Sequence, residues 1–409
     1  MTDPAATCQR GADLTPAAPP ILVIAGTRPE AVKLAPLVLA LRARAVPVVL
    51  VATGQHPDLF AATLAGFGLA ADVDLGMTAP TPDALVGQLV PVLADLMRRL
   101  RPAWAVVQGD TSSTLAGALA ARYAGVPLAH VEAGLRTGSD DPHPEELHRR
   151  LVAQMAALHL APTPAAAAAL AAEAVRGTVA ITGNTGIDAL LLMAARLEQD
   201  AGLAAAAVAP FAQVPRGRPW ILATIHRREN RGRQLAGILA ALADLAGEAE
   251  ILLPVHPGPA VAGPVRAMLA GRPHVHLLPP LPFAGFVALM MRSTLALTDS
   301  GGVQEEAPAL GLPCLVLRTA TERPEGVASG NARLVGVDRA MIVAAARAVL
   351  ADAGLRARMA VPALPYGDGG AAARITALLL RPDSASSPRT SESWSQSGGH
   401  RRSSPLGAR

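Results

Sequence analysis

Cysteine is almost absent from this chain of 409 residues, which has one in a polar segment, Cys8, and one in an apolar run, Cys314. Two isolated cysteines cannot form a disulfide framework, and they lack the spacing of zinc ligands. A reducing compartment such as the cytoplasm is consistent with this composition. His226 and His256 are also isolated in the sequence, and an isolated histidine is more often a structural residue than a metal ligand. We therefore predict no metal site.

Long apolar runs and targeting segments are missing as well. No uninterrupted apolar stretch is long enough to span a bilayer. The first residues contain acids and prolines instead of a basic start and an apolar stretch, so no signal peptide is expected. No G-x-G-x-x-G fingerprint follows a predicted strand, which argues against a bound nicotinamide. We predict a cytoplasmic protein with no cofactor and no membrane contact.

Lysine occurs once, at Lys33, among 36 basic residues. The net charge of +4 and the pI near 9.8 suggest an anionic partner. The arginines are nevertheless scattered and form no nucleic-acid-binding motif, so nucleic acid is not a predicted partner, whereas isolated arginines would suit a phosphate ligand. Lys33 follows a predicted helix start, where an anion contact is favourable, although a plain surface charge is also consistent with the sequence.

Short apolar runs alternate with longer helical patterns through most of the chain, which is typical of βαβ units and parallel sheets. In the first half, the predicted strands begin near Ile21, Pro47, Trp104, Pro127, His159 and Val179. In the second half they are WILATIH, EILLPVH, VHLLPP, TLALTDS and PCLVLR. The predicted fold class is α/β, with two Rossmann-like, doubly wound parallel-sheet domains.

The domain boundaries follow from composition and from the restart of the strand pattern. We expect one domain over residues 21–186 and a second over residues 187–365. Residues 1–20 and 381–409 are polar or rich in Ser, Arg and Gly, without hydrophobic periodicity. These end segments are predicted to be a disordered leader and a disordered tail.

Polar and charged residues follow the predicted strands with notable regularity. Ligands of such sheets bind beyond the carboxyl ends of the strands, so these residues are expected to share one crevice. They are Thr27, Arg28, Gln55, His56, Asp110, Thr111, Glu132, His226, Arg227, His256, Asp299 and Ser300.

Two helix starts carry further candidate residues. A predicted helix begins at Ser300, Gly301 and Gly302, and free amides at a helix start can bind phosphate. An ordinary Ser N-cap followed by a glycine turn would explain the same residues. Glu306 and Arg323, further along, could hold ribose hydroxyls and a diphosphate. Glu145 and Arg149 have the i,i+4 spacing of a helix start, which an ordinary surface ion pair also has.

A series of motifs in matching order resembles the non-hydrolysing UDP-N-acetylglucosamine (UDP-GlcNAc) 2-epimerases, from about Ile21 to about Leu380. The motifs are GTRPEAVKLAPLV, GQH, GDTSSTLAGALAA, HVEAGLRTG, PEELHRR, ITGNTGIDAL, HRREN, PVHPGP, LTDSGGVQEEAPALGLPCLVLR, TERPEG and PYGDG. The resemblance implies a GT-B fold in which a last helix, within residues 366–380, crosses back to the first domain. It also implies a homodimer that converts UDP-GlcNAc to UDP-N-acetylmannosamine (UDP-ManNAc).

The resemblance also implies roles for the matched residues. The catalytic set would be Asp110, Glu132, Glu145, Arg149 and His226. UDP would be bound by Arg28, Lys33, Phe286, Ser300, Gly301, Gly302, Glu306 and Arg323, together with His226. A second, allosteric UDP-GlcNAc would contact Gln55, Arg227 and His256. The chain departs from the family at His148, where Asn is usual, at Leu281, where a UDP-contacting Gln is usual, and at Pro57 and Asp58 in the allosteric motif.

Other functions remain compatible with these motifs. A hydrolysing epimerase would release UDP and free ManNAc, and an epimerase of another UDP-amino sugar would use the same elimination. A GT-B glycosyltransferase would share the UDP site but would not explain three acidic residues in the first domain. A catalytically silent nucleotide-sugar sensor would not need the complete catalytic set that the chain has.

Overall fold

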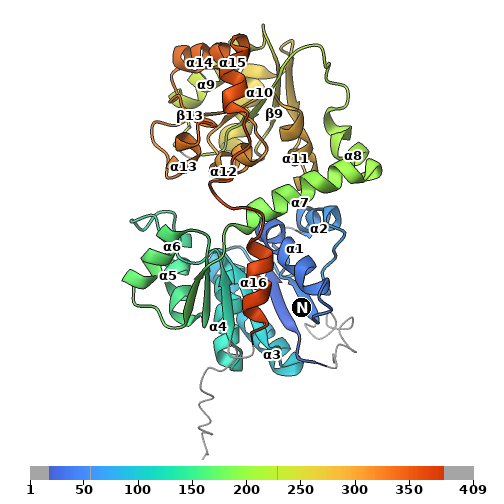
Figure 1. Cartoon of the computed structure of the whole chain (residues 1–409), viewed down its shortest axis with the longest axis vertical. Helices are drawn as coiled ribbons and strands as arrows, with labels where there is room; N and C mark the ends of the chain where they lie inside the picture. Colours follow the sequence, from blue (N-terminus) through green and yellow to red (C-terminus); the bar gives the residue numbers. More distant parts are fainter. Residues whose placement is uncertain (1–17, 56, 228, 382–409) are drawn as a thin grey trace, which may run out of the picture.

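The computed structural model describes residues 18–55, 57–227 and 229–381. In this part of the chain, two parallel sheets form two α/β domains, one above the other in Figure 1. The predicted fold class is thereby confirmed. The predicted disordered segments, 1–20 and 381–409, lie outside the described residues except for 18–20 and 381.

The first sheet has seven strands in the order β3-β2-β1-β4-β5-β6-β7, and neighbouring strands are parallel. They are β1 (Ile21–Ala25), β2 (Val48–Ala52), β3 (Val73–Asp74), β4 (Trp104–Gln108), β5 (Leu128–Val131), β6 (Leu158–Ala161) and β7 (Thr178–Ile181). The strand order reverses between β1 and β4, which is the switch point where doubly wound sheets bind ligands.

The second sheet has six parallel strands in the order β10-β9-β8-β11-β12-β13 and reverses between β8 and β11. They are β8 (Trp220–Thr224), β9 (Glu250–Pro254), β10 (Val275–Leu278), β11 (Leu295–Thr298), β12 (Cys314–Val316) and β13 (Ala332–Leu334). Strands β3 and β13 were not predicted from the sequence. These strands have only two and three residues, too few to show an apolar pattern.

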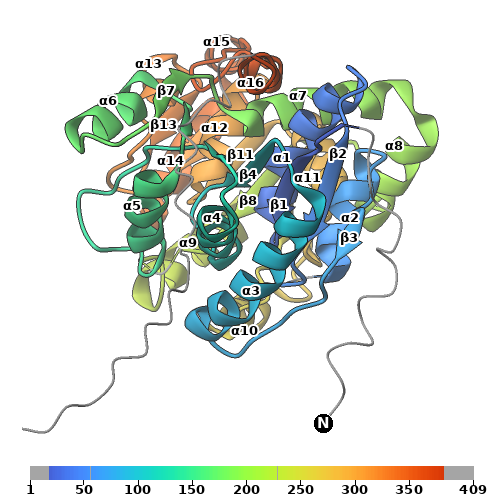
Figure 2. The ribbon, with the colours of Figure 1, turned by 90° about the horizontal axis from the view of Figure 1, so that it is seen from below.

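Helices cover both faces of each sheet, which explains why the strands are continuous apolar runs. Those before β8 are α1 (Arg28–Arg42), α2 (Pro57–Gly66), α3 (Pro82–Leu100), α4 (Ser112–Ala124), α5 (Glu145–Met155), α6 (Pro164–Ala172), α7 (Thr185–Gln199), α8 (Ala201–Val208) and the 3-10 turn η1 (Ala209–Phe211). Those after β8 are α9 (Arg233–Leu245), α10 (Pro259–Leu269), α11 (Phe283–Arg292), α12 (Gly301–Ala309), α13 (Pro324–Ala328), α14 (Arg339–Ala351), α15 (Ala353–Met359) and α16 (Ala371–Leu379). In Figure 2, α3 and α4 lie on the opposite side of β1 from α7 and α16. Within the described residues, no helix combines the length and apolarity needed to cross a membrane.

The two domains are joined by apolar packing as well as by the chain. One hydrophobic cluster includes core residues of both sheets, and α7 packs against α1 of the first domain and α11 of the second. The ring of Phe67, after α2, stacks on the ring of Phe283, at the start of α11, with centroids 5.8 Å apart. Burying a phenylalanine side chain stabilises a fold by about 1.5–3 kcal/mol, so these contacts hold the domains together firmly.

The last described helix, α16, returns to the first domain. It packs against α1 and α7, and it is drawn in red on the lower domain in Figure 1. Asp188 of α7 accepts hydrogen bonds from the amides of Ala371 and Ala372, at 3.2 and 2.7 Å. Free amides at a helix start favour a negative partner, so this buried carboxylate anchors the beginning of α16.

We expect Asp188→Ala to lower the free energy of unfolding by about 1–3 kcal/mol, because two buried amides lose their acceptor. Burial raises the pKa of Asp188, and the hydrogen bonds from both amides oppose that shift. Urea denaturation monitored by circular dichroism measures the effect. Asp95→Asn, at an exposed carboxylate of α3 paired with Arg99, is the control. Equal stability of Asp188→Ala and the parent would contradict the anchoring role.

Candidate active site

The candidate residues lie beyond the carboxyl ends of the strands of both sheets. All strands within a sheet are parallel, so every strand-to-helix turn emerges at the same edge. The turns after β1, β4 and β5 carry Arg28, Asp110 and Glu132, and those after β8 and β11 carry His226 and Ser300. Residues that follow the strands of one sheet therefore lie at the same edge of that sheet. That the residues of both sheets share one crevice stays a prediction, and His56 lies outside the described residues.

Lys33 and Glu132 form the first charged contact of the site. The Lys33 ammonium lies 2.5 Å from Oε2 of Glu132, and the side chains are 26% and 16% exposed. The Gln108 amide donates a hydrogen bond to the same oxygen. Burial lowers the pKa of Lys33, but Glu132, Glu305 and Asp110 outweigh burial and raise it overall. The single lysine is thus a permanent positive charge among carboxylates.

The backbone of Glu132 has a φ of 63° in the left-handed region. A residue other than glycine rarely adopts this conformation, and such strain is found preferentially at functional sites. The unusual turn directly after β5 directs the Glu132 side chain toward Lys33 of α1 and Gln108 of β4.

Asp110 and Arg149 form the second charged contact. Oδ2 of Asp110 accepts from both Nε and a terminal nitrogen of Arg149, at 2.8 and 2.6 Å. Burial raises the pKa of Asp110, with Arg149 opposing and Glu132 adding to that effect. Nδ1 of His148 donates to the main-chain oxygen of Asp110 at 2.8 Å, which ties α5 to the turn after β4.

Arg149 does not pair with Glu145, its i,i+4 neighbour on α5. It binds Oε2 of the buried Glu146 at 2.8 Å instead. Glu146 was not among the candidates selected from the sequence, although it lies three positions before Arg149 on the same helix. The side chain of Glu145 is half-buried at the start of α5.

Glu30 is a second carboxylate that the sequence analysis did not select. It is buried, with 1% exposure, and one of its oxygens accepts from Gly26, Thr27 and the Thr27 hydroxyl at 2.7–3.0 Å. Its other oxygen accepts from the Thr111 and Thr114 hydroxyls at 2.7 and 3.2 Å. Glu30 therefore holds together the turns that carry Arg28 and Asp110. The capping-box pattern of Thr27 and Glu30 is the sequence signal that would have identified it.

The second domain contributes a helix start and an arginine. Ser300 is the N-cap of α12, and its hydroxyl makes no capping hydrogen bond. The Arg323 guanidinium covers Gly301 so closely that a Cβ there would lie 2.6–2.8 Å from it, whereas a Cβ on Gly302 would meet only Ser300 Oγ, at 3.9 Å. Small residues at this helix start thus leave room for Arg323 beside the free amides, which is an arrangement suited to a phosphate.

Glu306 lies one turn further along α12 and is half-buried. Burial raises its pKa to about 8, and Glu305 adds to the shift, while Lys33 and Arg28 oppose it. The charges of Lys33 and Arg28 belong to the first domain, so electrostatic interactions cross the domain boundary here. Arg28, which is exposed, also reaches across to donate to the main-chain oxygen of Leu281 at 3.1 Å.

The turn after β8 is fixed by the fully buried Asp299. Its carboxylate accepts from the amides of His226 and Arg227 at 3.0–3.1 Å and from the Asn230 side chain at 3.0 Å. The His226 ring stacks on His256, with centroids 6.2 Å apart. Burial lowers the pKa of His226 although Asp299 opposes the shift, so the neutral ring is favoured.

Arg227 and Arg323 share a carboxylate. Glu322 Oε1 accepts from Arg227 at 2.8 Å and from Arg323 at 2.7 Å.

Gln55 accepts from the Ser113 hydroxyl at 3.3 Å, within the first domain. Phe286 is half-buried on α11. Among the described residues, no hydrogen bond or ion pair joins Glu145, Phe286 or Gln55 to another candidate.

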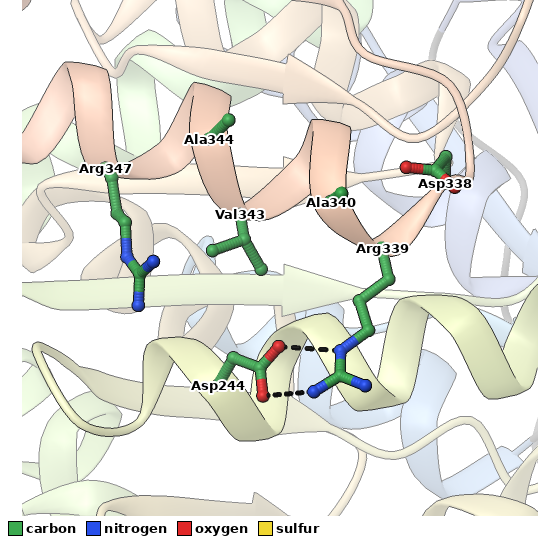
Figure 3. Close-up of a pocket in the computed structure, with 7 residues that line it drawn as sticks. All are labelled: Asp244, Asp338, Arg339, Ala340, Val343, Ala344 and Arg347. Atoms are coloured by element: carbon green, nitrogen blue, oxygen red, sulfur yellow. Dashed lines mark hydrogen bonds and ion pairs between the residues drawn. The ribbon is translucent and has the colours of Figure 1, made fainter.

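A surface hollow of about 430 Å³ lies elsewhere, between α9 and α14 of the second domain. Figure 3 shows that Arg339 spans it to form two contacts with Asp244, each 2.7 Å long. None of the candidate residues lines this hollow. No group of three His, Cys, Asp or Glu side chains in the described ranges is arranged to hold a metal ion.

Comparison with known proteins gives consistent matches over most of the chain. The family model for UDP-N-acetylglucosamine 2-epimerase matches residues 39–380. A probable UDP-N-acetylglucosamine 2-epimerase of Ralstonia nicotianae is 42% identical over 364 residues, covering 87% of this chain and 97% of the relative. The Escherichia coli UDP-N-acetylglucosamine 2-epimerase is 41% identical over 372 residues, covering 88% and 98%. The crystal structure of Neisseria meningitidis UDP-GlcNAc 2-epimerase bound to UDP-GlcNAc matches with a TM-score of 0.80 and 36% identity, covering 88% of this chain and 99% of that one.

The raised pKa of Glu306 predicts a specific pH dependence of stability. The folded protein binds this proton up to about pH 8, whereas the ordinary pKa is 4.5. The unfolded chain therefore holds fewer protons between these values, and the stability of the ligand-free protein should fall as pH rises through this window.

Glu306→Gln should remove this part of the pH dependence, because glutamine does not titrate. Thermal unfolding at pH 5.5 and pH 8.5 measures the effect, and the change in Tm between these conditions should be smaller in the variant. Glu248→Gln, at an exposed glutamate paired with Arg347, should retain the parent's dependence. An unchanged pH dependence in Glu306→Gln would show that Glu306 is ionised throughout.

Proposed function

The chain belongs to the UDP-N-acetylglucosamine 2-epimerase family, and we propose that it interconverts UDP-GlcNAc and UDP-ManNAc without net hydrolysis. The observation that carries this proposal is that Lys33, the partner of Glu132 in the first domain, interacts electrostatically with Glu305 and Glu306 on α12 of the second domain. Two sets of groups therefore lie at the domain boundary. Asp110 and Glu132 with Lys33 come from the first domain, and the Ser300 helix start with Arg323 comes from the second. The first set suits proton transfer at a sugar, and the second suits a diphosphate.

The diphosphate of UDP would lie at the start of α12. Ser300, Gly301 and Gly302 would present free amides, the helix dipole would favour the negative charge, and Arg323 would add a charge-assisted contact. Arg28 and Lys33 would approach from the first domain. Glu306 would meet the ribose hydroxyls, and Phe286 would lie beside the uracil.

The chemistry requires more than a base. The C2 hydrogen of a pyranosyl nucleotide is not beside a carbonyl, so direct deprotonation is too unfavourable. When the C1–O bond breaks and its electron pair leaves with UDP, positive charge at C1 acidifies the C2 hydrogen. A carboxylate then removes that proton and a glycal forms. Protonation of C2 from the opposite face and readdition of UDP at C1 give the epimer.

The environments of the first-domain carboxylates support these roles. The raised pKa of Asp110 favours its protonated form relative to an ordinary aspartate, which suits a group that exchanges a proton, while Lys33 and Gln108 keep Glu132 oriented. Glu145 would supply a third carboxylate near the sugar. Arg149 would orient Asp110, and His226 would stabilise the departing diphosphate.

Two departures from the family contact the site directly. The His148 ring forms a hydrogen bond with the main-chain oxygen of Asp110. The main-chain oxygen of Leu281 accepts a hydrogen bond from the Arg28 guanidinium. Family members usually have the amide side chains Asn and Gln at these two positions. His148 and Leu281 would therefore make different contacts with the sugar or the nucleotide. Another UDP-amino sugar is therefore the second substrate to test.

We also propose that Gln55, Arg227 and His256 bind a second, regulatory UDP-GlcNAc. The stacking of His256 on His226 and the shared carboxylate between Arg227 and Arg323 support this idea, because they place two of the three residues next to the proposed UDP site. A homodimer is the assembly proposed for this enzyme.

The experiment that tests the function is proton NMR of the purified protein with UDP-GlcNAc in D₂O. Appearance of UDP-ManNAc with deuterium at C2 and without accumulation of free sugar is the expected result. Free ManNAc would indicate a hydrolysing enzyme instead. If UDP-GlcNAc gives an unchanged spectrum and another UDP-amino sugar is turned over, that other sugar is the substrate.

Asp110→Asn and Glu132→Gln should each reduce turnover by at least about 100-fold, because proton transfer by a positioned group typically contributes 10²–10⁴-fold. Their affinity for UDP should remain close to that of the parent, since the proposed UDP contacts lie mainly in the second domain. Coupled turnover assays and calorimetric titration with UDP separate the two effects. Asp95→Asn, at an exposed carboxylate of α3, is the control. Full activity in both variants would remove these carboxylates from the mechanism.

A further inference from the structure

Two motifs of the sequence, ITGNTGIDAL and PYGDG, remain without a function in the proposal above, and residues from both meet Glu305 and Arg323 at the domain boundary. Asn184 belongs to ITGNTGIDAL and follows β7 of the first domain. Glu305 and Arg323 belong to the second domain, in the helix α12 and in the TERPEG segment. Tyr366 belongs to PYGDG, in the segment that leads back to α16. The chain therefore passes this point when it leaves the first domain and again when it returns.

Asn184 bonds to both domains through the two ends of its amide. Oδ1 accepts from the amide of Gly186 at 2.8 Å and thereby caps α7. Nδ2 donates to Oε2 of Glu305 on α12 at 2.8 Å. A helix cap needs only the oxygen, so capping does not explain the second bond.

Glu305 also accepts a hydrogen bond from Arg323. Its other oxygen, Oε1, accepts from Nε of Arg323 at 2.7 Å, and the two side chains are 20% and 23% exposed. A partly buried ion pair is screened less by water than the contact of Arg323 with Glu322, which is 51% exposed. Glu305 is therefore the partner that fixes the guanidinium over Gly301.

The returning segment holds the backbone of the same arginine. The Tyr366 hydroxyl donates to the main-chain oxygen of Arg323 at 3.0 Å and accepts from the amide of Gly326 at 2.8 Å. Gly367 lies so close to Asn184 that a Cβ on residue 367 would be 3.2 Å from the main-chain nitrogen of Asn184. The chain thus makes contacts here on leaving the first domain and on returning to it. Asn184, on the way out, contacts Glu305, and Tyr366, on the way back, contacts the main chain of Arg323.

We propose that Asn184 is a positioning residue for Arg323 and acts through Glu305. In this way the first domain determines the orientation of a guanidinium in the second domain that Asn184 does not touch. The inference rests on the proposed role of Arg323 as a ligand of the UDP diphosphate. Arginine has many rotamers, so fixing it before the ligand arrives reduces the entropy lost on binding.

Asn184→Ser tests this proposal without removing the helix cap. Serine caps a helix about as well as asparagine, but its short hydroxyl replaces the amide that donates to Glu305, and no charge is added. Thr163→Ser makes a matched change at the N-cap of α6, where the Thr163 side chain accepts from Ala166. Arg323→Ala and the double variant Asn184→Ser/Arg323→Ala complete a double-mutant cycle.

Calorimetric titration of the full-length variants with UDP is the measurement. We expect Asn184→Ser to raise the Kd for UDP about 5- to 20-fold through lost preorganisation, and Thr163→Ser to change it less than about 2-fold. In the Arg323→Ala background, Asn184→Ser should add less than about 2-fold. Turnover of Asn184→Ser should show a raised KM with kcat near that of the parent, because the first-domain carboxylates are unaffected. A structural defect would instead lower the active fraction or kcat.

Each other outcome overturns the inference. A Kd for Asn184→Ser within 2-fold of the parent would show that the amide does not support Arg323. A full effect of Asn184→Ser in the absence of Arg323 would show that it acts by another route. If the parent protein itself does not bind UDP, the proposed function fails together with this inference, whereas UDP binding by the parent with unchanged Asn184→Ser affinity removes the inference alone.

Discussion

Parallel strand direction is the constraint on which the site of this protein depends. In both sheets every strand-to-helix turn emerges at the carboxyl edge, so residues that are tens of positions apart in sequence become neighbours. Asp110 follows β4 and Glu132 follows β5, and each finds its cation, Arg149 or Lys33, on a helix at the same edge. Strands in alternating directions would divide these residues between two opposite edges.

Charge balance is the second requirement at this edge, because carboxylates removed from water need cations or hydrogen-bond donors. Lys33 supplies a cation to Glu132, and its field also reaches Glu306 across the domain boundary. Glu30 is satisfied differently, by main-chain amides and threonine hydroxyls at the turns after β1 and β4. The same groups that satisfy the carboxylates also fix the turns, so the charge pattern and the backbone geometry stabilise each other.

The domain boundary combines rigid and polar contacts. Phe67 and Phe283 stack in an apolar part of the boundary, while Asn184, Glu305 and Arg323 form a hydrogen-bonded series beside the candidate phosphate site. Apolar packing has little directional preference, whereas hydrogen bonds require defined angles. The apolar contacts therefore hold the domains together, and the polar series defines how the groups on the two sides are oriented.

The sequence by itself determined the α/β class, eleven of the strands and the family, because buried strands are apolar runs and because the motifs that follow them are local patterns. It could not place the short edge strands β3 and β13, which lack a pattern. Only the tertiary structure decided which charges pair. Arg149 binds Asp110 and Glu146 instead of Glu145, and Asn184 reaches Glu305, 121 positions away. Hydrogen bonds act between atoms a few ångströms apart, and the folding of the chain, not spacing in the sequence, determines those distances.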